Sequence, residues 1–459
     1  MNIYIGLENT IRELDSKLLL ASLAASKGHK VLISNIASIE KGIKWGFLSP
    51  GIFHTKSLTP SRRKINLHKS IIGKGNLVTS IDEEAGLIQN NYEIFAKERF
   101  SNETIKDASA VFCWGSDDAE TLKKIYSGYS SKLFKTGSPR VDLWKPVFLK
   151  YWGKLQKKPN RPFLLVVSNM SKANFVEPFK NIIKKHKKND LYKFKPHLFK
   201  NTFVTASEQY RTILAFIEAI RYIAEKNKNY DIVLRPHQNE DIESWKIYLD
   251  ELPNVYVIRE GSITRWINNS FAVMHNGCTT ALEARICNKP LITYIPNKQE
   301  LFGNDLPNEL GLKVKTKEDL FLKVNYFFDQ SQLNNKINSE ISLPEQIIRK
   351  LYIDNKELAA EKIVKIWENL VIDQSKFSKA NKWRSFEVFL KLIKINQIRK
   401  KIFTRFYSEE LNYKIDNYKF PSFDIDDINY KIEKFKTVLP INKEIKCKLI
   451  SERAILIKL

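Results

Sequence analysis

The chain of 459 residues is poor in cysteine and has no long apolar run. Its four cysteines are scattered without the close spacing of a zinc site, so we expect no metal and a reducing compartment. No stretch approaches the roughly 18 consecutive apolar residues of a membrane-spanning helix. The first residues enter a strand pattern directly, with no basic leader, which argues against export. These absences predict a cytoplasmic protein, without internal repeats or low-complexity tracts.

The sequence also lacks the Gly-x-Gly-x-x-Gly signature of dinucleotide-binding proteins, which disfavours an NAD site. Its opening nevertheless follows the pattern of a Rossmann-like unit. An apolar strand at 3–7 precedes a helical face at 13–27, Gly28 and His29 end that helix, and a second strand follows at 31–34. We therefore predict an α/β fold with two Rossmann-like domains.

The formal charge of +25 is compatible with nucleic acid, acidic lipid or a nucleotide sugar as partner. An alternative interpretation is a composition that uses lysine freely, since the chain is also rich in Ile and Asn. No segment matches an RNA-binding module, so we rank an anionic membrane surface or another partner above nucleic acid. A peripheral position at the inner face of the plasma membrane follows as an expectation.

The length suffices for two domains and an appendage. Residues 145–162 are charged and contain three prolines, which indicates a linker. We predict an N-terminal Rossmann-like domain at 1–150 for the acceptor and the catalytic acids, and a nucleotide-sugar-binding domain at 151–328. Residues 329–459 are expected to form a helical, basic C-terminal region.

The most informative stretch runs from 231 to 296. An apolar strand at 232–234 is expected to end at Pro236, between Arg235 and His237, because proline cannot donate to a strand ladder. A later strand at 271–274 runs straight into a turn of small and hydroxyl residues, and a helix follows at 281–285.

That turn predicts a nucleotide site, because a helix N-terminus has unpaired N–H groups and a partial positive charge. Gly277 allows close approach of the backbone, Thr279 and Thr280 offer hydroxyl donors, and Glu283 offers an acceptor for a ribose. The predicted nucleotide-binding and phosphate-binding set comprises Arg235, His237, His275, Asn276, Gly277, Thr279, Thr280 and Glu283. The alternative is an ordinary strand-turn-helix, with Thr279 as a helix cap and His275 as a core histidine.

Three consecutive acids, Asp82, Glu83 and Glu84, follow a predicted strand at 76–80. Buried unpaired carboxylates are costly, so these acids either face solvent at a helix start or serve chemistry. By alternation along the strand, we expect Asp82 to point into the site, Glu83 to face solvent, and Glu84 either to return toward the site or to cap the turn.

The residues 275–284 and 288–296 resemble the nucleotide-binding stretch of GT-B glycosyltransferases, in which a glycine turn holds phosphate and a glutamate holds ribose. Those enzymes commonly have a second glycine at the position of Asn276. The resemblance implies that the acceptor binds to the first domain.

A second resemblance covers about residues 1–325. The stretches 82–86, 112–115 and 136–142 are similar to an Asp-Glu-Glu-Gly, a Trp-Gly and a Gly-x-Pro-Arg-x-Asp stretch of the bacterial surface carbohydrate biosynthesis family. Ala85 stands where that family has glycine. The family is distantly similar to capsular Kdo transferases and to CDP-glycerol glycerophosphotransferases, which implies a cytidine-activated donor and a substrate contact for Arg140.

Together these features predict a glycosyltransferase that moves Kdo or another ulosonate from a CMP-linked donor to a lipid-linked or polysaccharide acceptor. Asp82, Glu84 and Glu83 are the candidate catalytic residues. The nucleotide sugar is a substrate, so no cofactor is expected. The alternatives are a CDP-polyol phosphotransferase, a sugar-nucleotide epimerase, and a non-catalytic glycan-assembly or nucleotide-binding factor.

Overall fold

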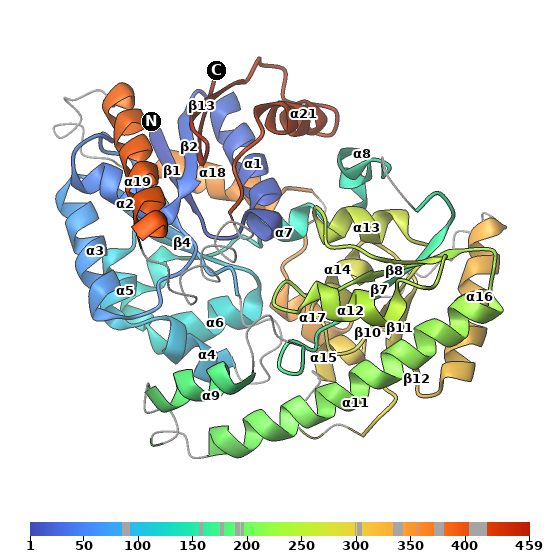
Figure 1. Ribbon diagram of the computed structural model, residues 1–459. Helices are drawn as coiled ribbons and strands as arrows, with labels where there is room; N and C mark the ends of the chain where they lie inside the picture. The colour runs from blue at the N-terminus through green and yellow to red at the C-terminus, as the bar shows by residue number, and fades with distance from the viewer. Residues whose placement is uncertain are drawn as a thin grey trace. The chain divides into compact units, whose positions relative to one another are not determined.

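A computed structural model describes residues 1–84, 92–155, 159–174, 179–188, 193, 197–298, 300, 305–333, 343–354, 356–370, 381–403 and 420–459. The chain folds into two compact units (Figure 1). The first contains residues 1–143 together with 343–459, and the second contains residues 144–342. Each unit is built around its own sheet.

The first unit has an eight-stranded sheet in the order β13-β14-β2-β1-β3-β4-β5-β6. Strands β1 to β6 are parallel, whereas β14 runs antiparallel to β2, and β13 antiparallel to β14. The strands are β1 Asn2–Leu7, β2 Lys30–Asn35, β3 Ile52–Thr55, β4 Leu77–Ile81, β5 Ala110–Cys113, β6 Leu133–Lys135, β13 Lys446–Ser451 and β14 Ala454–Lys458. The direction of winding reverses between β1 and β3, which is where open α/β sheets bind ligands.

The helices of the first unit form because apolar residues recur on one face, and polar side chains cap the N-termini of several of them. In α1, Asn9 accepts a hydrogen bond from the Arg12 amide at the start, and Gly28 follows the end with a φ of +89°, which favours glycine. The helices are α1 Thr10–Ser26, α2 Ile36–Lys44, α3 Arg62–Gly73, α4 Tyr92–Arg99, α5 Asn102–Asp107, α6 Ser116–Ile125, η1 Ser127–Lys132, α7 Pro139–Asp142, α17 Glu345–Lys350, α18 Ala359–Asn369, α19 Trp383–Phe403 and α21 Ile425–Lys436.

The second unit has six parallel strands in the order β12-β11-β10-β7-β8-β9, so its winding reverses between β7 and β10. Its strands are β7 Phe163–Val167, β8 Asp231–Arg235, β9 Val255–Val257, β10 Ala272–His275, β11 Leu291–Tyr294 and β12 Leu312–Val314. Its helices are η2 Pro146–Phe148, α8 Leu149–Trp152, α9 Phe179–Lys188, α11 His197–Lys226, α12 Ile242–Leu249, α13 Ile263–Asn269, α14 Thr280–Ile286, α15 Asp305–Asn308 and α16 Lys317–Gln332. The apolar face of α11 packs into this core through Phe216, Ile220 and Ile223.

The predicted α/β class with two Rossmann-like sheets is confirmed. Residues 343–459, which lie within the predicted C-terminal region, belong to the first unit and add β13 and β14 to its sheet. Residues 145–162 do not form a simple linker, since η2 and α8 lie within them. Among the described helices, none is both long and apolar enough to cross a membrane.

Candidate functional site

In the second unit, the predicted glycine turn lies at the point where the winding of the sheet reverses. Gly277 follows β10 with a φ of +62°, and its N–H donates to Asn308 Oδ1 at 2.7 Å. Asn169, which follows the neighbouring strand β7, donates from Nδ2 to the Gly277 carbonyl at 3.3 Å. The chain therefore holds this turn across the carboxyl ends of β7 and β10, where ligands of such sheets bind.

Arg235 ends β8, as predicted, but the described bonds of its guanidinium go to the protein backbone. It donates to the carbonyl of Glu260 at 2.6 Å and to that of Gly261 at 2.9 Å, and it lies over the Trp266 ring at 5.2 Å from the centroid. These contacts fix the loop after β9. His237 follows on the same side of the sheet, where its Nδ1 accepts from the Asn239 amide at 3.3 Å.

His275 and Asn276 bond within the sheet. His275 is fully buried, its Nε2 lies 3.0 Å from the Thr293 hydroxyl, and burial lowers its pKa to about 3. Asn276 donates from Nδ2 to the Tyr294 carbonyl at 2.8 Å. Both side chains thus connect β10 to β11, and His275 has the environment of a neutral core histidine.

This burial predicts a pH effect. The unfolded chain takes up a proton on His275 below its ordinary pKa of 6.5, whereas the folded chain takes it up only near pH 3. The stability that the neutral His275 contributes is therefore complete above pH 6.5. It falls as the pH drops, by about 2 kcal/mol between pH 6.5 and 5. In His275→Gln this contribution is absent, so the difference in unfolding free energy between wild type and variant should shrink at pH 5. Urea unfolding at pH 7 and pH 5 measures it, and an equal difference at both pH values would contradict the assignment.

The remaining members of the predicted set lie on or beside α14. Thr279 precedes the helix, is exposed and makes no capping bond through its side chain, and Thr280 is half-buried at the first helical position. Glu283 is buried one turn later and accepts a hydrogen bond from the Thr264 hydroxyl on α13. Of this set, Thr279 is the side chain presented to solvent beside the glycine turn.

Glu240 is a site residue that the sequence analysis missed. Its fully buried carboxylate accepts from the Ser168 hydroxyl at 2.9 Å, the Met170 amide at 2.9 Å, the Trp245 indole at 2.8 Å and the His237 amide at 3.3 Å. Burial raises its pKa, although these bonds act in the opposite direction. Glu240 therefore ties the chain after β7 to the chain after β8, and no sequence pattern around it signals this role.

In the first unit, Asp82, the first candidate for a catalytic acid, is held by an arginine. Asp82 is buried and accepts two bonds from Arg99, Nε to Oδ2 at 2.8 Å and Nη2 to Oδ1 at 3.0 Å. Its carbonyl accepts from the Trp114 indole at 2.9 Å. Glu84 is half exposed and pairs with Arg12 at 3.2 Å. Asp82 thus has the contacts of a residue that fixes the turn after β4.

The expectation that Glu83 faces solvent is wrong. Glu83 is 4% exposed, its amide donates to the Lys56 carbonyl at 3.1 Å after β3, and its Oε1 lies 2.5 Å from Nζ of the equally buried Lys17. Within the described residues, no donor reaches its second oxygen, Oε2. Alternation along a strand failed here because the hydrogen bond to Lys56 turns the backbone once β4 has ended.

A second buried carboxylate, Glu13, lies one turn before Lys17 on α1. Burial raises the pKa of Glu13, and the negative charge of Glu83 raises it further. Burial also acts to raise the pKa of Glu83, but the charges of Lys17, Arg140 and Arg12 outweigh it, so this pKa lies below its ordinary value. The first unit therefore places two carboxyl groups with opposite pKa shifts at one edge of its sheet, an arrangement typical of acid and base pairs.

A cavity of about 270 Å³ opens beside this cluster, at the carboxyl ends of β1, β2 and β3. Its charged lining residues are Glu8, Glu40, Lys56, Arg63 and Lys64. This is the reversal point of the first sheet, so the position suits a polar ligand. Within the described ranges, no three His, Cys, Asp or Glu side chains are grouped as a metal site.

No protein-family model matches the chain, and no curated protein matches it. Solved structures do. A UDP-GlcNAc 2-epimerase from Neisseria meningitidis is 14% identical over 81% of this chain and 100% of its own, with a TM-score of 0.45. A glycosyltransferase from Rickettsia africae is 13% identical over 83% and 99%, with a TM-score of 0.41. A wall teichoic acid polymerase is 12% identical over 69% and 72%, with a TM-score of 0.39. At these sequence identities and TM-scores, the matches do not indicate which chemistry this chain performs.

Proposed function

We propose that the protein is a glycosyltransferase of surface polysaccharide synthesis, which moves a sugar from a nucleotide-linked donor to a growing glycan. The observation that carries the proposal is the buried group of Glu13, Lys17 and Glu83 at the carboxyl edge of the first sheet. A buried ion pair contributes little to stability compared with apolar residues of the same size, so its presence at a ligand-binding edge favours a chemical role.

Within this proposal, Glu83 acts on the acceptor. Lys17 keeps the Glu83 carboxylate ionised, so it accepts the proton of the acceptor hydroxyl while that oxygen bonds to the sugar carbon. The sugar–phosphate bond breaks in the same step and releases the nucleotide. Glu13, whose raised pKa favours the protonated form, takes no proton in this step. Arg140, which lowers the pKa of Glu83, adds positive charge for an anionic sugar. Asp82 and Glu84 support this site through Arg99 and Arg12.

The donor half of the proposal lies in the second unit. The turn around Gly277, with the exposed Thr279 beside it, receives the phosphate of the nucleotide, and Glu283 lies one turn further along α14. A CMP-linked ulosonate such as Kdo is the donor that the sequence resemblance favours. Backbone amides and hydroxyls stabilise the leaving phosphate in this scheme, so no metal takes part.

The nucleotide site is tested by thermal shift. CMP at ~100 times its dissociation constant should stabilise wild type by about 2.7 kcal/mol. Thr279→Ala should lose most of that shift and keep the melting temperature of the ligand-free protein, because the exposed hydroxyl makes no capping bond.

Thr316→Ala is the matched control, since Thr316 is also exposed at a helix start but its hydroxyl accepts from the Asp319 amide at 3.1 Å. This variant should lose about 1 kcal/mol of stability and keep the CMP shift. If Thr279→Ala keeps the full shift, the phosphate binds elsewhere. A shift with UDP but not CMP would replace the proposed donor.

A nucleotide-sugar epimerase is the second candidate, because two carboxyl groups with opposite pKa shifts also suit removal and return of a proton at a sugar carbon. Incubation with CMP-Kdo plus acceptor, and separately with UDP-GlcNAc, distinguishes the two. Release of CMP that depends on the acceptor supports transfer. Exchange of deuterium from D₂O into the sugar supports epimerisation.

A further inference from the structure

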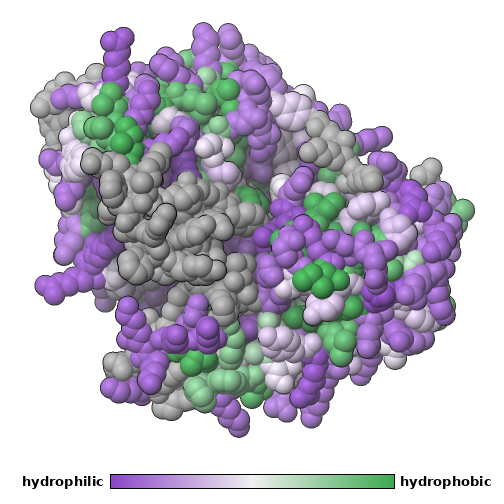
Figure 2. All heavy atoms as spheres, in the orientation of Figure 1, coloured by the Kyte–Doolittle hydropathy of each residue, from purple (hydrophilic) through white to green (hydrophobic). Residues whose placement is uncertain are grey.

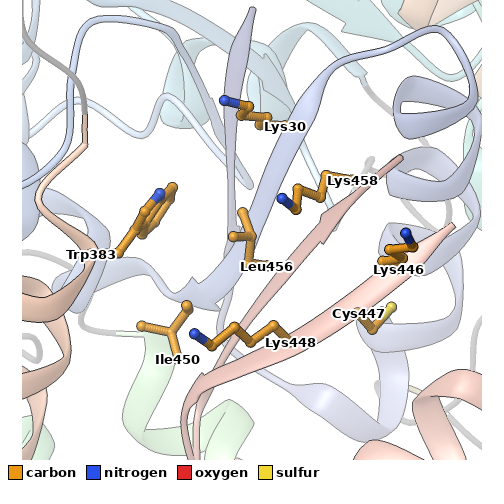
Figure 3. A pocket seen from close by; sticks show the side chains of 8 residues that line it. All are labelled: Lys30, Trp383, Lys446, Cys447, Lys448, Ile450, Leu456 and Lys458. Carbon is orange, nitrogen blue, oxygen red and sulfur yellow. The ribbon is translucent and has the colours of Figure 1, made fainter.

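A second basic site lies on the first unit, on the face formed by β2, β13 and β14 (Figure 3). It is a cavity of about 230 Å³ lined by four lysines, Lys30, Lys446, Lys448 and Lys458, with Trp383 at one side. Its lining residues include no carboxylate.

Three of these lysines form a row across neighbouring strands. Lys446 of β13 is directly paired with Lys458 of β14. Ile457 is paired with Val31, so the next position in register sets Lys458 beside Lys30 of β2. Like charges that face each other across strands destabilise a sheet, so this row costs folding stability unless an anion balances it.

One acid senses the charge of a lining lysine but does not balance it. Glu387 on α19 senses Lys448, but its carboxylate already pairs with Lys391 at 2.8 Å. The cavity also lies away from the candidate catalytic group. Lys30 begins β2 at the amino edge of the sheet, whereas Glu83 follows the carboxyl end of β4. The lysines are therefore placed to hold an anion that does not react.

Helix α19 begins at Trp383, packs against β13, and is apolar on two sides. Phe386, Phe389 and Leu390 are buried in the core. The side roughly half a turn away presents Val388, Leu392 and Ile395, which are 56%, 55% and 52% exposed.

Arg384, Lys391 and Lys394 of α19 are exposed as well. In the upper left of Figure 2, where Figure 1 draws α19, apolar and hydrophilic atoms share the surface. An exposed apolar stripe with basic neighbours is the pattern of a helix that lies in a membrane interface.

We propose that this face of the first unit lies on an anionic membrane, with the α19 stripe in the interface and a lipid phosphate in the lysine cavity. Tryptophan at the rim fits this placement, because its ring favours the headgroup region. The surface would hold the enzyme beside a lipid-linked acceptor. This membrane role does not depend on the proposed transfer reaction.

The test uses Lys458→Glu in the full chain. The new carboxylate lies between Lys446 and Lys30, so the variant should melt higher than wild type at low salt while binding to vesicles falls. Sedimentation with vesicles of phosphatidylcholine, with and without phosphatidylglycerol, measures binding. We expect wild type to bind only the anionic vesicles, and each lysine changed to alanine to weaken binding roughly fivefold. Leu392→Ser with Ile395→Ser should also weaken binding.

Lys123→Glu on α6 is the matched control, because this exposed lysine lies near β6, at the opposite end of the sheet. It should bind nearly as wild type does. Equal loss in the control, equal binding to neutral vesicles, or a lower melting temperature of Lys458→Glu would overturn the proposal. A melting shift of wild type with inorganic pyrophosphate, but no vesicle binding, would identify a soluble phosphate ligand and overturn the membrane role.

Discussion

Lys17→Met should destabilise the first unit by about 3 to 5 kcal/mol and abolish sugar transfer. Lys17 and Glu83 are 1% and 4% exposed, and their charged atoms lie 2.5 Å apart. Removal of the lysine leaves the Glu83 carboxylate buried beside Glu13 with less positive charge to stabilise it. Urea unfolding measures the first effect, and acceptor-dependent release of CMP measures the second.

The double variant Lys17→Met with Glu83→Gln separates structure from chemistry. With both charges removed, no uncompensated charge remains buried, so much of the lost stability should return. Transfer should remain at least 10²-fold below wild type, because the base is still absent. If the double variant transfers sugar at the wild-type rate, the pair serves stability alone and the catalytic proposal fails.

An exposed ion pair supplies the control for these variants. Lys97 and Glu93 on α4 lie 2.7 Å apart, with 61% and 46% of their side chains exposed. Lys97→Met should cost less than about 1 kcal/mol and leave transfer unchanged. A loss as large as that of Lys17→Met would mean that the effect does not come from burial.

The sequence predicts the central strands well because apolar runs in parallel sheets carry a strong signal. Strands β1, β8 and β10 lie where their hydrophobic patterns place them, and β8 ends immediately before Pro236. The sequence analysis does not predict β14, because its partner β2 is hundreds of residues away and pairing at such a distance has no local signature. Strand β13 joins the sheet through β14, its partner across a short turn.

The acid cluster shows the same limit at the level of side chains. The sequence locates Asp82, Glu83 and Glu84, but not which of them is buried. Which acid is buried depends on its partner: Lys17, a residue within an apolar helix pattern, pairs with Glu83, and Arg99 pairs with Asp82. Neither partner is next to the acids in the sequence, so these pairs can be identified only in the folded chain.

Glu240→Ala should be the most damaging single change in the second unit. The carboxylate accepts four hydrogen bonds from buried or half-buried groups, among them the Ser168 hydroxyl and the Trp245 indole. Its removal leaves these donors without a partner, and each buried unsatisfied group costs about 1 to 3 kcal/mol. We expect the unfolding free energy to fall by roughly 4 kcal/mol or more in total. The CMP-dependent melting shift should disappear as well, because the chain after β7 is released.

Glu240→Gln tests the charge of this residue, because it removes the ionisable carboxyl group and keeps a side chain of similar size. Burial raises the pKa of Glu240, so the folded chain binds this proton more tightly than the unfolded chain does. The stability that Glu240 contributes is therefore complete below the ordinary pKa of a glutamate. It is lost as the pH rises through the pKa of Glu240 in the folded chain. The Gln variant lacks this dependence, so its unfolding free energy should decline less than that of wild type between pH 4 and 7. Parallel slopes for wild type and variant, or an Ala variant as stable as wild type, would show that Glu240 does not organise this site.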